Sequence, residues 1–273
     1  MARVELPESR LRLRKRRRRV RLTVVLAAGI LLLLSGAVDL AYLPALQISA
    51  VQVEGAQTVS SSTVEAFVRE RLEGSYAYIL PKTDIFLYPK RSIARALVAA
   101  YPQFASVDVH AVDFRTIAVA VVEREPRALW CADRCYLMDE NGVVYGEAPV
   151  FSAPVYTTYQ GTTTGERLPK QFLAPGEFLP LSALVDAIAQ KIPGERLQEV
   201  EVDAQFDVQM HFEGAAPAGG QGLTVRFALH DEGGDVFERF TLALSSAPFK
   251  DKPLSGFEYL DLRFGDKLYY KER

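Results

Sequence analysis

The sequence has few of the residues that build metal sites or catalytic nucleophiles. It contains three histidines, two cysteines and one tryptophan in 273 residues. His110, His211 and His230 have no neighbour at ligand spacing, and no H-E-x-x-H motif occurs. Two cysteines alone cannot complete a four-ligand structural zinc site, and the G-x-S-x-G nucleophile motif is missing. We therefore expect no enzyme, no catalytic residue, no metal and no cofactor.

The other polar patterns favour structure over chemistry. All three histidines fall on the polar phase of predicted strands, so we expect them to face solvent. His211 and His230 could be neighbours on adjoining strands, where the two side chains together could bind a metal ion. Glu199, Glu201 and Asp203 share one strand face. Paired carboxylates can act as acid and base, but no apolar setting that would raise a pKa is visible, so we expect a solvated sheet edge.

The longest apolar run is Leu22–Val38, which has seventeen residues and no charge. A helix of about 17 to 20 apolar residues can cross a hydrocarbon core. We predict a transmembrane helix over 22–43, behind a disordered basic tail at 1–21. A cleaved signal peptide stays open, because Ser35-Gly36-Ala37 resembles a cleavage site, although the apolar run exceeds the usual length of such a signal.

Charge is distributed unevenly along the chain. Residues 1–21 carry ten basic and two acidic side chains, or +8, and since the whole chain is −2, the remainder is −10. The basic end is expected in the cytoplasm, which places the rest of the chain outside it. An acidic extracytoplasmic part argues against nucleic acid as its partner. Outside the cytoplasm, Cys131 and Cys135 could form a disulfide across a tight hairpin; two free thiols is the alternative.

Residues 48–123 predict an α+β unit with the order β-α-α-β-β. Val51 and Val53 alternate with polar residues and lead to a turn at Gly55. Ser62 and Glu65 fit a capping box at the start of a helix that stops at Gly74. A second helix follows Pro89 and stops at Tyr101-Pro102, and two strands are predicted at 106–112 and 116–123.

The remainder, 124–271, predicts a mixed β-domain with antiparallel strands and two helices. An Asn141-Gly142 hairpin turn of type I′ comes first, and a Pro-, Gly- and Thr-rich loop is expected over 147–180. A helix is predicted at 181–192, and a second begins with Asp235 as its cap. Phe206, Val208, Met210 and Phe212 alternate with polar residues, as do Leu223, Val225, Phe227 and Leu229. The segment 214–222, GAAPAGGQG, is expected to join those strands as a flexible loop and not to cradle phosphate, because it opens a strand and not a helix. A closing hairpin is expected over 257–271, with its turn at Gly265-Asp266.

Several segments together resemble one known family. They are VQVEGAQTVS, TDIF, YPQFASVDV, and the run Glu123-Arg124-Glu125-Pro126-Arg127-Ala128-Leu129-Trp130, followed by a hairpin with aspartate and glycine and by Asp261-Leu262-Arg263-Phe264 near the end. With the N-terminal apolar helix, this combination resembles the FtsQ/DivIB family of bacterial cell-division proteins. The resemblance covers about 48–145 and 195–271 and implies that 48–123 is a POTRA domain.

The resemblance implies a non-enzymatic scaffold in the cell (inner) membrane at the division septum. Its partners would be small bitopic proteins of the FtsB/DivIC and FtsL type, bound by strand addition at the C-terminal edge. Arg263 would pair with an acidic residue of the partner, while Leu260 and Leu262 are expected to close the core. The implied partner-binding residues are Arg263, Phe264, Lys267, Leu268, Tyr269 and Tyr270.

Two other classes remain alternatives. One is a different POTRA-bearing protein, such as a protein-transport or envelope-assembly factor. Those proteins carry repeated POTRA units and a membrane β-barrel, and neither is visible here. The other is an anchored cell-wall enzyme, which would need a titratable cluster in a cleft.

Overall fold

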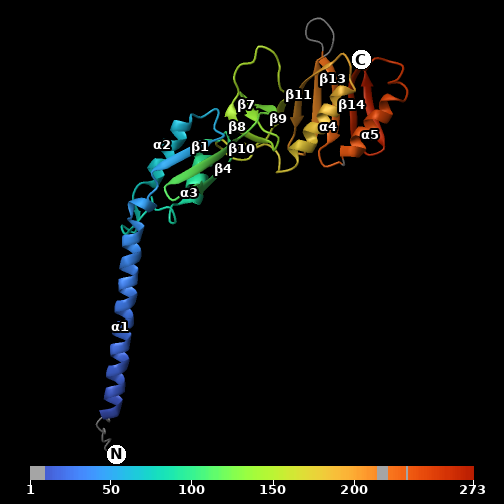
Figure 1. Ribbon diagram of the computed structural model, residues 1–273. Coiled ribbons are helices and arrows are strands. Elements are labelled where there is room, and N and C mark those ends of the chain that lie inside the picture. Colours follow the sequence, from blue (N-terminus) through green and yellow to red (C-terminus); the bar gives the residue numbers. More distant parts are fainter. Residues whose placement is uncertain (1–9, 214–220, 232) are drawn as a thin grey trace, which may run out of the picture. The chain divides into compact units, whose positions relative to one another are not determined.

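The computed structural model describes residues 10–213, 221–231 and 233–273. These residues form a mixed α/β structure with five α-helices and a large mixed sheet (Figure 1). The chain divides into two compact units, Met1–Glu123 and Arg124–Arg273, each with its own apolar core. Most of the loop expected at 214–222 lies outside the described residues, and Gln221 already belongs to a strand.

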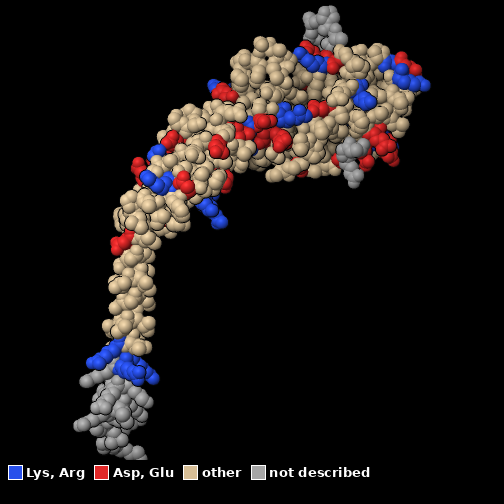
Figure 2. Space-filling model, viewed as in Figure 1, with Lys and Arg blue, Asp and Glu red and all other residues tan. Residues whose placement is uncertain are grey.

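The N-terminal helix α1 spans Arg10–Ala41. Its stretch Arg18–Ala41 is 24 residues long and apolar enough to cross a membrane. Figure 2 shows that the middle of α1 carries no charged side chain. The predicted tail at 1–21 is therefore partly wrong, because the helix already begins at Arg10. Arginine, lysine and leucine are good helix formers, so the basic run continues the apolar helix instead of fraying.

Unit 1 folds around a three-stranded sheet in the order β1-β5-β4. The central strand β5 is parallel to β1 and antiparallel to β4. A small two-stranded ribbon, β2 with β3, was not predicted and lies between the helices in the sequence. The elements of unit 1 after α1 are the 3-10 helix η1 (Pro44–Leu46), β1 (Ala50–Glu54), α2 (Ser61–Leu72), β2 (Ser75–Tyr76), β3 (Leu80–Pro81), α3 (Lys90–Ala100), β4 (Phe104–Ala111) and β5 (Thr116–Glu123).

The predicted apolar faces of α2 and α3 supply the core of unit 1. Val64, Val68 and Leu72 from α2 are buried with Ile93 and Leu97 from α3. The helix cap was predicted two residues too late. Ser60, not Ser62, caps α2 by accepting a hydrogen bond from the Thr63 backbone N–H at 3.2 Å. Three successive serines can each cap a helix, and the first has the extended backbone that a cap requires.

Unit 2 is built on a ten-stranded mixed sheet with the order β10-β8-β7-β6-β9-β11-β12-β13-β14-β15. Strand β9 is parallel to both of its neighbours, and β13 is parallel to β14, while the other pairs are antiparallel. The strands are β6 (Ala128–Cys131), β7 (Cys135–Met138), β8 (Val143–Glu147), β9 (Thr158–Gly161), β10 (Lys170–Gln171), β11 (Arg196–Val202), β12 (Asp207–Glu213), β13 (Gln221–Ala228), β14 (Phe257–Phe264) and β15 (Lys267–Glu272).

Helices α4 (Phe178–Gln190) and α5 (Gly233–Leu244) contact each other and pack on one face of this sheet (Figure 1). We call this the helix-covered face and the other the open face. Helix α5 begins at Gly233, so Asp235 lies in its first turn and is not its cap. Val208, Met210 and Phe212 are buried as predicted, but Phe206 is exposed with φ +63°, because it lies in the turn before β12.

The segment 147–180 is not simply a loop, because it supplies β9 to the middle of the sheet. Tyr159 of this strand is 1% exposed, and its ring meets those of Phe172 and Phe178 at 6.0 and 5.1 Å. Trp130 donates its indole N–H to the Gly161 carbonyl at 3.1 Å, which ties β6 to β9. A four-residue strand with one large apolar side chain carries too little alternation to be predicted.

The hairpin between β7 and β8 has a different turn from the one predicted. Gly142 has φ +73°, but Asn141 does not have the positive φ that a type I′ turn requires at both central residues. Asp139 organises the turn instead, because its carboxylate accepts hydrogen bonds from the backbone N–H groups of Asn141 and Val143. Arg124 also donates to this carboxylate at 2.5 Å. Beside this hairpin, Cys131 and Cys135 are joined in a disulfide, the first of the two alternatives.

The polar residues of the central strands lie differently from the prediction. Strand β11 is inside the sheet between β9 and β12, so Glu199 and Glu201 are not on an edge. Both are half-buried, and Glu199 accepts a hydrogen bond from Gln160 at 2.8 Å. His211 pairs with Thr224 in the sheet register, whereas the His230 ring packs against Phe206 beyond the strand. The two histidines are therefore not cross-strand neighbours.

Candidate partner-binding edge

The sheet of unit 2 ends at β15, and no strand of the described chain pairs with its outer side. The strand is antiparallel to β14, and the two-residue turn Gly265-Asp266 joins them. Gly265 has φ +59°, which a tight hairpin turn requires and which glycine adopts without strain. The hairpin thus presents a row of main-chain donors and acceptors along its outer edge.

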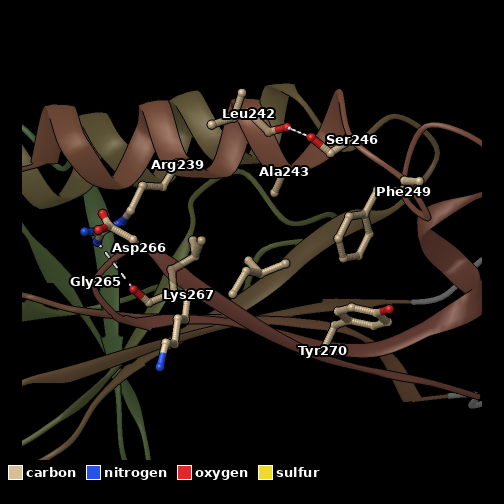
Figure 3. Close-up of a pocket in the computed structure, with 12 residues that line it drawn as sticks. Arg239, Leu242, Ala243, Ser246, Phe249, Gly265, Asp266, Lys267 and Tyr270 are labelled. Atoms are coloured by element: carbon tan, nitrogen blue, oxygen red, sulfur yellow. Dashed lines mark hydrogen bonds between the residues drawn. The ribbon is translucent and has the colours of Figure 1, made fainter.

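Side chains of β15 line one wall of a groove on the helix-covered face. The groove has a volume of about 310 Å³ and lies between the end of α5 and β15 (Figure 3). Leu268 and Tyr270 line it from β15, and Leu242 lines it from α5. Phe249 borders it on one side, where its ring meets that of Tyr270 at 5.0 Å, nearly perpendicular at 76°. The groove is therefore partly apolar and opens beside the unpaired edge.

An aromatic pair lies at the turn of the hairpin. The rings of Phe264 and Tyr269 meet edge to face, with centroids 5.0 Å apart. Both remain exposed, at 53% and 49%. Large aromatic side chains at the surface are the usual anchors of protein interfaces, because they bury much area at little entropic cost. This pair and the groove therefore lie on the same hairpin as the open strand edge.

The half-buried Arg263 binds carboxylates of its own chain. Its Nε and Nη2 atoms donate to the two carboxylate oxygens of Asp261 at 2.9 and 2.6 Å, and Nη1 donates to Asp207. The guanidinium also lies 5.6 Å from the centre of the Phe264 ring. The family resemblance implied that Arg263 would meet an acidic residue of a partner, but in this structure its partners are the chain's own carboxylates.

This ion-pair cluster changes the pKa values of its members. Burial pushes the pKa of Asp261 upward, but the hydrogen bonds from Arg263 outweigh it and hold that pKa below its ordinary value. Hydrogen bonds to Asp261 and then to Asp207 raise the pKa of Arg263 further above its already high value. Asp261 is 4% exposed although the strand pattern places it on the polar phase. The cluster therefore fixes the open face of β14 just before the turn.

The six implied residues do lie together on one hairpin, but they divide into two groups. Tyr270, Leu268 and Lys267 line the groove on the helix-covered face. Arg263 belongs to the cluster with Asp207, and Phe264 packs with Tyr269. Sequence reasoning missed Asp207, Phe249 and the groove-lining residues of α5. No local signal could have found Asp207, which is 56 residues from Arg263 in the sequence.

The edge combines unpaired main-chain groups with exposed aromatic side chains. Among the described residues no group of three or more His, Cys, Asp or Glu side chains could hold a metal ion. An open strand edge can accept a strand from another chain through main-chain hydrogen bonds, and flanking side chains then select that strand. Lys271 pairs with Glu258 and Lys252 with Glu272, each at 2.6 Å, so charged groups also border the edge.

Comparison with models of protein families finds no match to this sequence. A search of curated proteins also finds no match.

Proposed function

We propose that the protein is a membrane-anchored, non-enzymatic scaffold of the FtsQ/DivIB type, which links septal membrane proteins during bacterial cell division. Its partners would be bitopic proteins of the FtsB/DivIC and FtsL type, bound outside the cytoplasm. The observation that carries the proposal is the unpaired strand β15, bordered by an exposed aromatic pair and a groove, in a chain with an N-terminal apolar helix.

The arrangement of unit 1 supports the POTRA assignment. Its elements follow the order expected from the sequence, with a small ribbon added between the helices. The last strand, β5, lies in the middle of the sheet and runs parallel to β1. Glu123 at the end of β5 accepts hydrogen bonds from the backbone N–H groups of Gln57 and Thr58. The first residue of the Glu-Arg-x-Pro segment thus ties the last strand of unit 1 to the chain that follows β1.

The binding mode would be addition of a partner strand to β15. Main-chain hydrogen bonds would give affinity, while Phe264, Tyr269 and the groove beside Tyr270 would select the partner. Arg263 would act indirectly, because two carboxylates already hold it beside the Phe264 ring. We therefore propose that Arg263 positions the aromatic pair and is not itself the main contact.

Tyr269→Asp, in the full-length chain, tests this function. An aspartate at this position would place an unpaired charge in the interface, so co-purification with a co-expressed DivIC- or FtsL-type partner should be lost. Removal of an interface anchor typically costs about 2 kcal/mol or more, roughly a 30-fold loss of affinity. Hydrogen exchange of the β15 amides should also slow when the partner binds the unmodified chain, because strand addition buries them.

Leu179→Asp supplies the matched control. Leu179 is an equally exposed apolar residue at 49%, and it lies on α4 beside β9, five strands from β15 in the sheet order. Its substitution should leave co-purification intact. Partner binding that survives Tyr269→Asp, with no change in β15 exchange, would contradict the proposed edge.

A further inference from the structure

Unit 1 exposes several large apolar side chains at one end of its sheet. They come from the turn between β2 and β3, from the turn before α3, and from the loop between β4 and β5. The four that define the surface, here called the apolar rim, are Tyr78, Ile79, Phe86 and Phe114, with exposures of 98%, 54%, 70% and 63%. Such a group on a water-soluble surface calls for a covering layer.

The first turn of the rim is strained. Ala77 and Tyr78 have φ values of +48° and +63°. These lie in the left-handed region, which residues other than glycine, asparagine and aspartate rarely adopt. Packing of the Tyr78 side chain within the protein does not offset that strain, because the side chain is almost fully exposed. Strained residues of this kind are common where a chain contacts something outside itself.

The second turn is ordered by a buried carboxylate. Asp84, 3% exposed, accepts hydrogen bonds from the backbone N–H groups of Phe86 and Leu87 at 2.8 and 3.1 Å. The Tyr76 hydroxyl donates to the Leu87 carbonyl at 3.1 Å and joins this turn to the ribbon. Phe86 then projects outward, with its ring 6.4 Å from that of Phe114. Hydrogen bonds therefore hold this part of the rim in a defined conformation.

The rim adjoins the place where the chain leaves α1. Backbone hydrogen bonds run from Ile48 to Thr83 at 2.8 Å and from Ile85 to Leu46 at 3.0 Å. The side chain of Gln47 donates to the carbonyl of Ala41, the last residue of α1, at 2.5 Å.

The third part of the rim is tied to the same stretch of chain. The Ser49 backbone N–H donates to the carbonyl of Arg115, next to Phe114, at 2.8 Å. The second and third parts of the rim are thus fastened to residues that directly follow α1, and the first part is joined to the second through the Tyr76 hydroxyl.

We propose that the apolar rim rests in the interfacial layer of the membrane leaflet from which α1 emerges, so that lipid covers Tyr78, Ile79, Phe86 and Phe114. The proposal rests on the membrane anchorage included in the proposed function. A tyrosine favours the headgroup region, where its ring is shielded and its hydroxyl stays wet, while the apolar side chains of Phe86, Phe114 and Ile79 gain by leaving water at the headgroup–acyl boundary. Because α1 tethers the rim at the leaflet, the effective concentration of lipid beside it is high, and even weak insertion keeps the contact occupied.

The charges beside the rim argue for apolar insertion over attraction to anionic lipid. Arg115 stands next to Phe114, but Asp113 lies on the other side of that residue. Lys82 follows β3, and the carboxylate of Asp84 is close behind it in the sequence. Opposite charges therefore alternate in both loops, and contact should persist in membranes without anionic lipid.

The test uses spin labels on the full-length chain in lipid nanodiscs of zwitterionic phosphatidylcholine. Phe86→Cys and Phe114→Cys are labelled one at a time. Since Cys131 and Cys135 are joined in a disulfide, the introduced thiol is the one available. Accessibility of each label to lipid-soluble oxygen and to a water-soluble nickel chelate reports its surroundings. Both rim labels should favour oxygen over the chelate.

Two further positions make the result decisive. Val122→Cys is an exposed control, 57%, near the far end of β5, about 20 Å along the strand from Thr116. Its label should favour the chelate. Leu32→Cys, within α1, should favour oxygen because that helix is proposed to cross the bilayer.

Rim labels as accessible to the chelate as the Val122 label would overturn the inference. Labels shielded from both reagents would indicate a protein contact and overturn it equally. If the Leu32 label is in lipid while the rim labels are not, the anchor stands and only the inference fails. A Leu32 label in water would refute the anchorage itself, and the inference with it.

Discussion

At the scale of single residues, Asp261 and Arg263 determine what the last hairpin presents. Strand alternation places both on the polar phase, yet Asp261 is buried and Arg263 is half-buried. A buried carboxylate is tolerated because Arg263 binds it with two hydrogen bonds. Asp207 draws the same guanidinium toward β12. The cluster thereby fixes the strand that carries Phe264. The Arg263 side chain, which was expected to reach a partner, instead binds the chain's own Asp261 and Asp207.

Asp261→Asn should lower the free energy of unfolding of unit 2 by about 1–3 kcal/mol, because Arg263 loses a charged acceptor. The folded state depresses the pKa of Asp261, so its contribution is present above the ordinary pKa of the carboxyl group and is lost as pH falls through the folded value. The difference between variant and unmodified chain should therefore shrink in acid. Denaturation followed by Trp130 fluorescence measures it, since Trp130 belongs to unit 2.

Asp266→Asn in the neighbouring turn is the control for this substitution. Asp266 is exposed in the two-residue loop of the same hairpin, so its variant should unfold like the unmodified chain. An Asp261→Asn effect that stays constant from neutral pH into acid would show that the carboxylate charge is not what stabilises the cluster.

At the scale of elements, the sequence predicted the strands and helices that have a long periodic pattern. The helices at Ser61–Leu72 and Lys90–Ala100 and the closing hairpin were all predicted close to their observed bounds. Short elements held by distant partners were missed. Strand β9 is the clearest case, because Tyr159 is buried by Phe172 and Phe178, which the local sequence cannot show.

Polar turn residues were predicted correctly in kind but not always in position. The capping-box pattern favoured Ser62, because Glu65 follows it by three residues, and only the backbone shows that Ser60 is the residue before the helix. The Asn-Gly pair suggested a type I′ turn, but the Asp139 side chain stabilises another turn by accepting two backbone hydrogen bonds. Side-chain competition of this kind is a three-dimensional effect that dipeptide preferences do not include.

The disulfide at the tip of the β6–β7 hairpin should contribute modestly to stability. It closes a loop with a sequence separation of only 4 residues, and loop-closure entropy for so short a loop amounts to about 2 kcal/mol. The double variant Cys131→Ala, Cys135→Ala should lose about this amount or less. Thermal unfolding with and without reductant checks it.

Reductant provides the internal control for the disulfide. It should shift the unmodified chain to the midpoint of the double variant, while the double variant should not respond. A response of the double variant, or none of the unmodified chain, would contradict the assigned bond.

At the scale of the whole molecule, the two apolar cores account for the two units. Val64, Leu97 and Ile117 belong to the first, whereas Val200, Phe240 and Leu260 belong to the second. Much of this division could be predicted from hydrophobic periodicity and turn residues. The candidate edge was predicted in part. The hairpin follows from alternation and its turn residues, but alternation places Phe264 on the apolar phase of Leu260 and Leu262, and only the family resemblance implied that it faces a partner. The groove beside α5 depends on packing across 20 or more residues.

The N-terminal helix should remain attached in the mature protein. Its uncharged run Leu22–Val38, with seventeen residues, is longer than the apolar region of a typical cleaved signal. The native chain should therefore migrate on a denaturing gel with the full-length product and above a chain that begins at Leu40. Migration with the shorter chain would mean cleavage, and the protein would then lack its proposed anchor.

The place of β9 in the sheet has a mechanical consequence. Among the described strands, this four-residue strand is the one whose pairing joins the block β10-β8-β7-β6 to the block β11-β12-β13-β14-β15. Two residue pairs connect it to β6, and four connect it to β11. If the proposed partner at β15 pulled against the proposed N-terminal anchor, the load on the sheet would cross the seam between β6 and β9. The Trp130 hydrogen bond to Gly161 is therefore placed where the sheet would first come apart under tension.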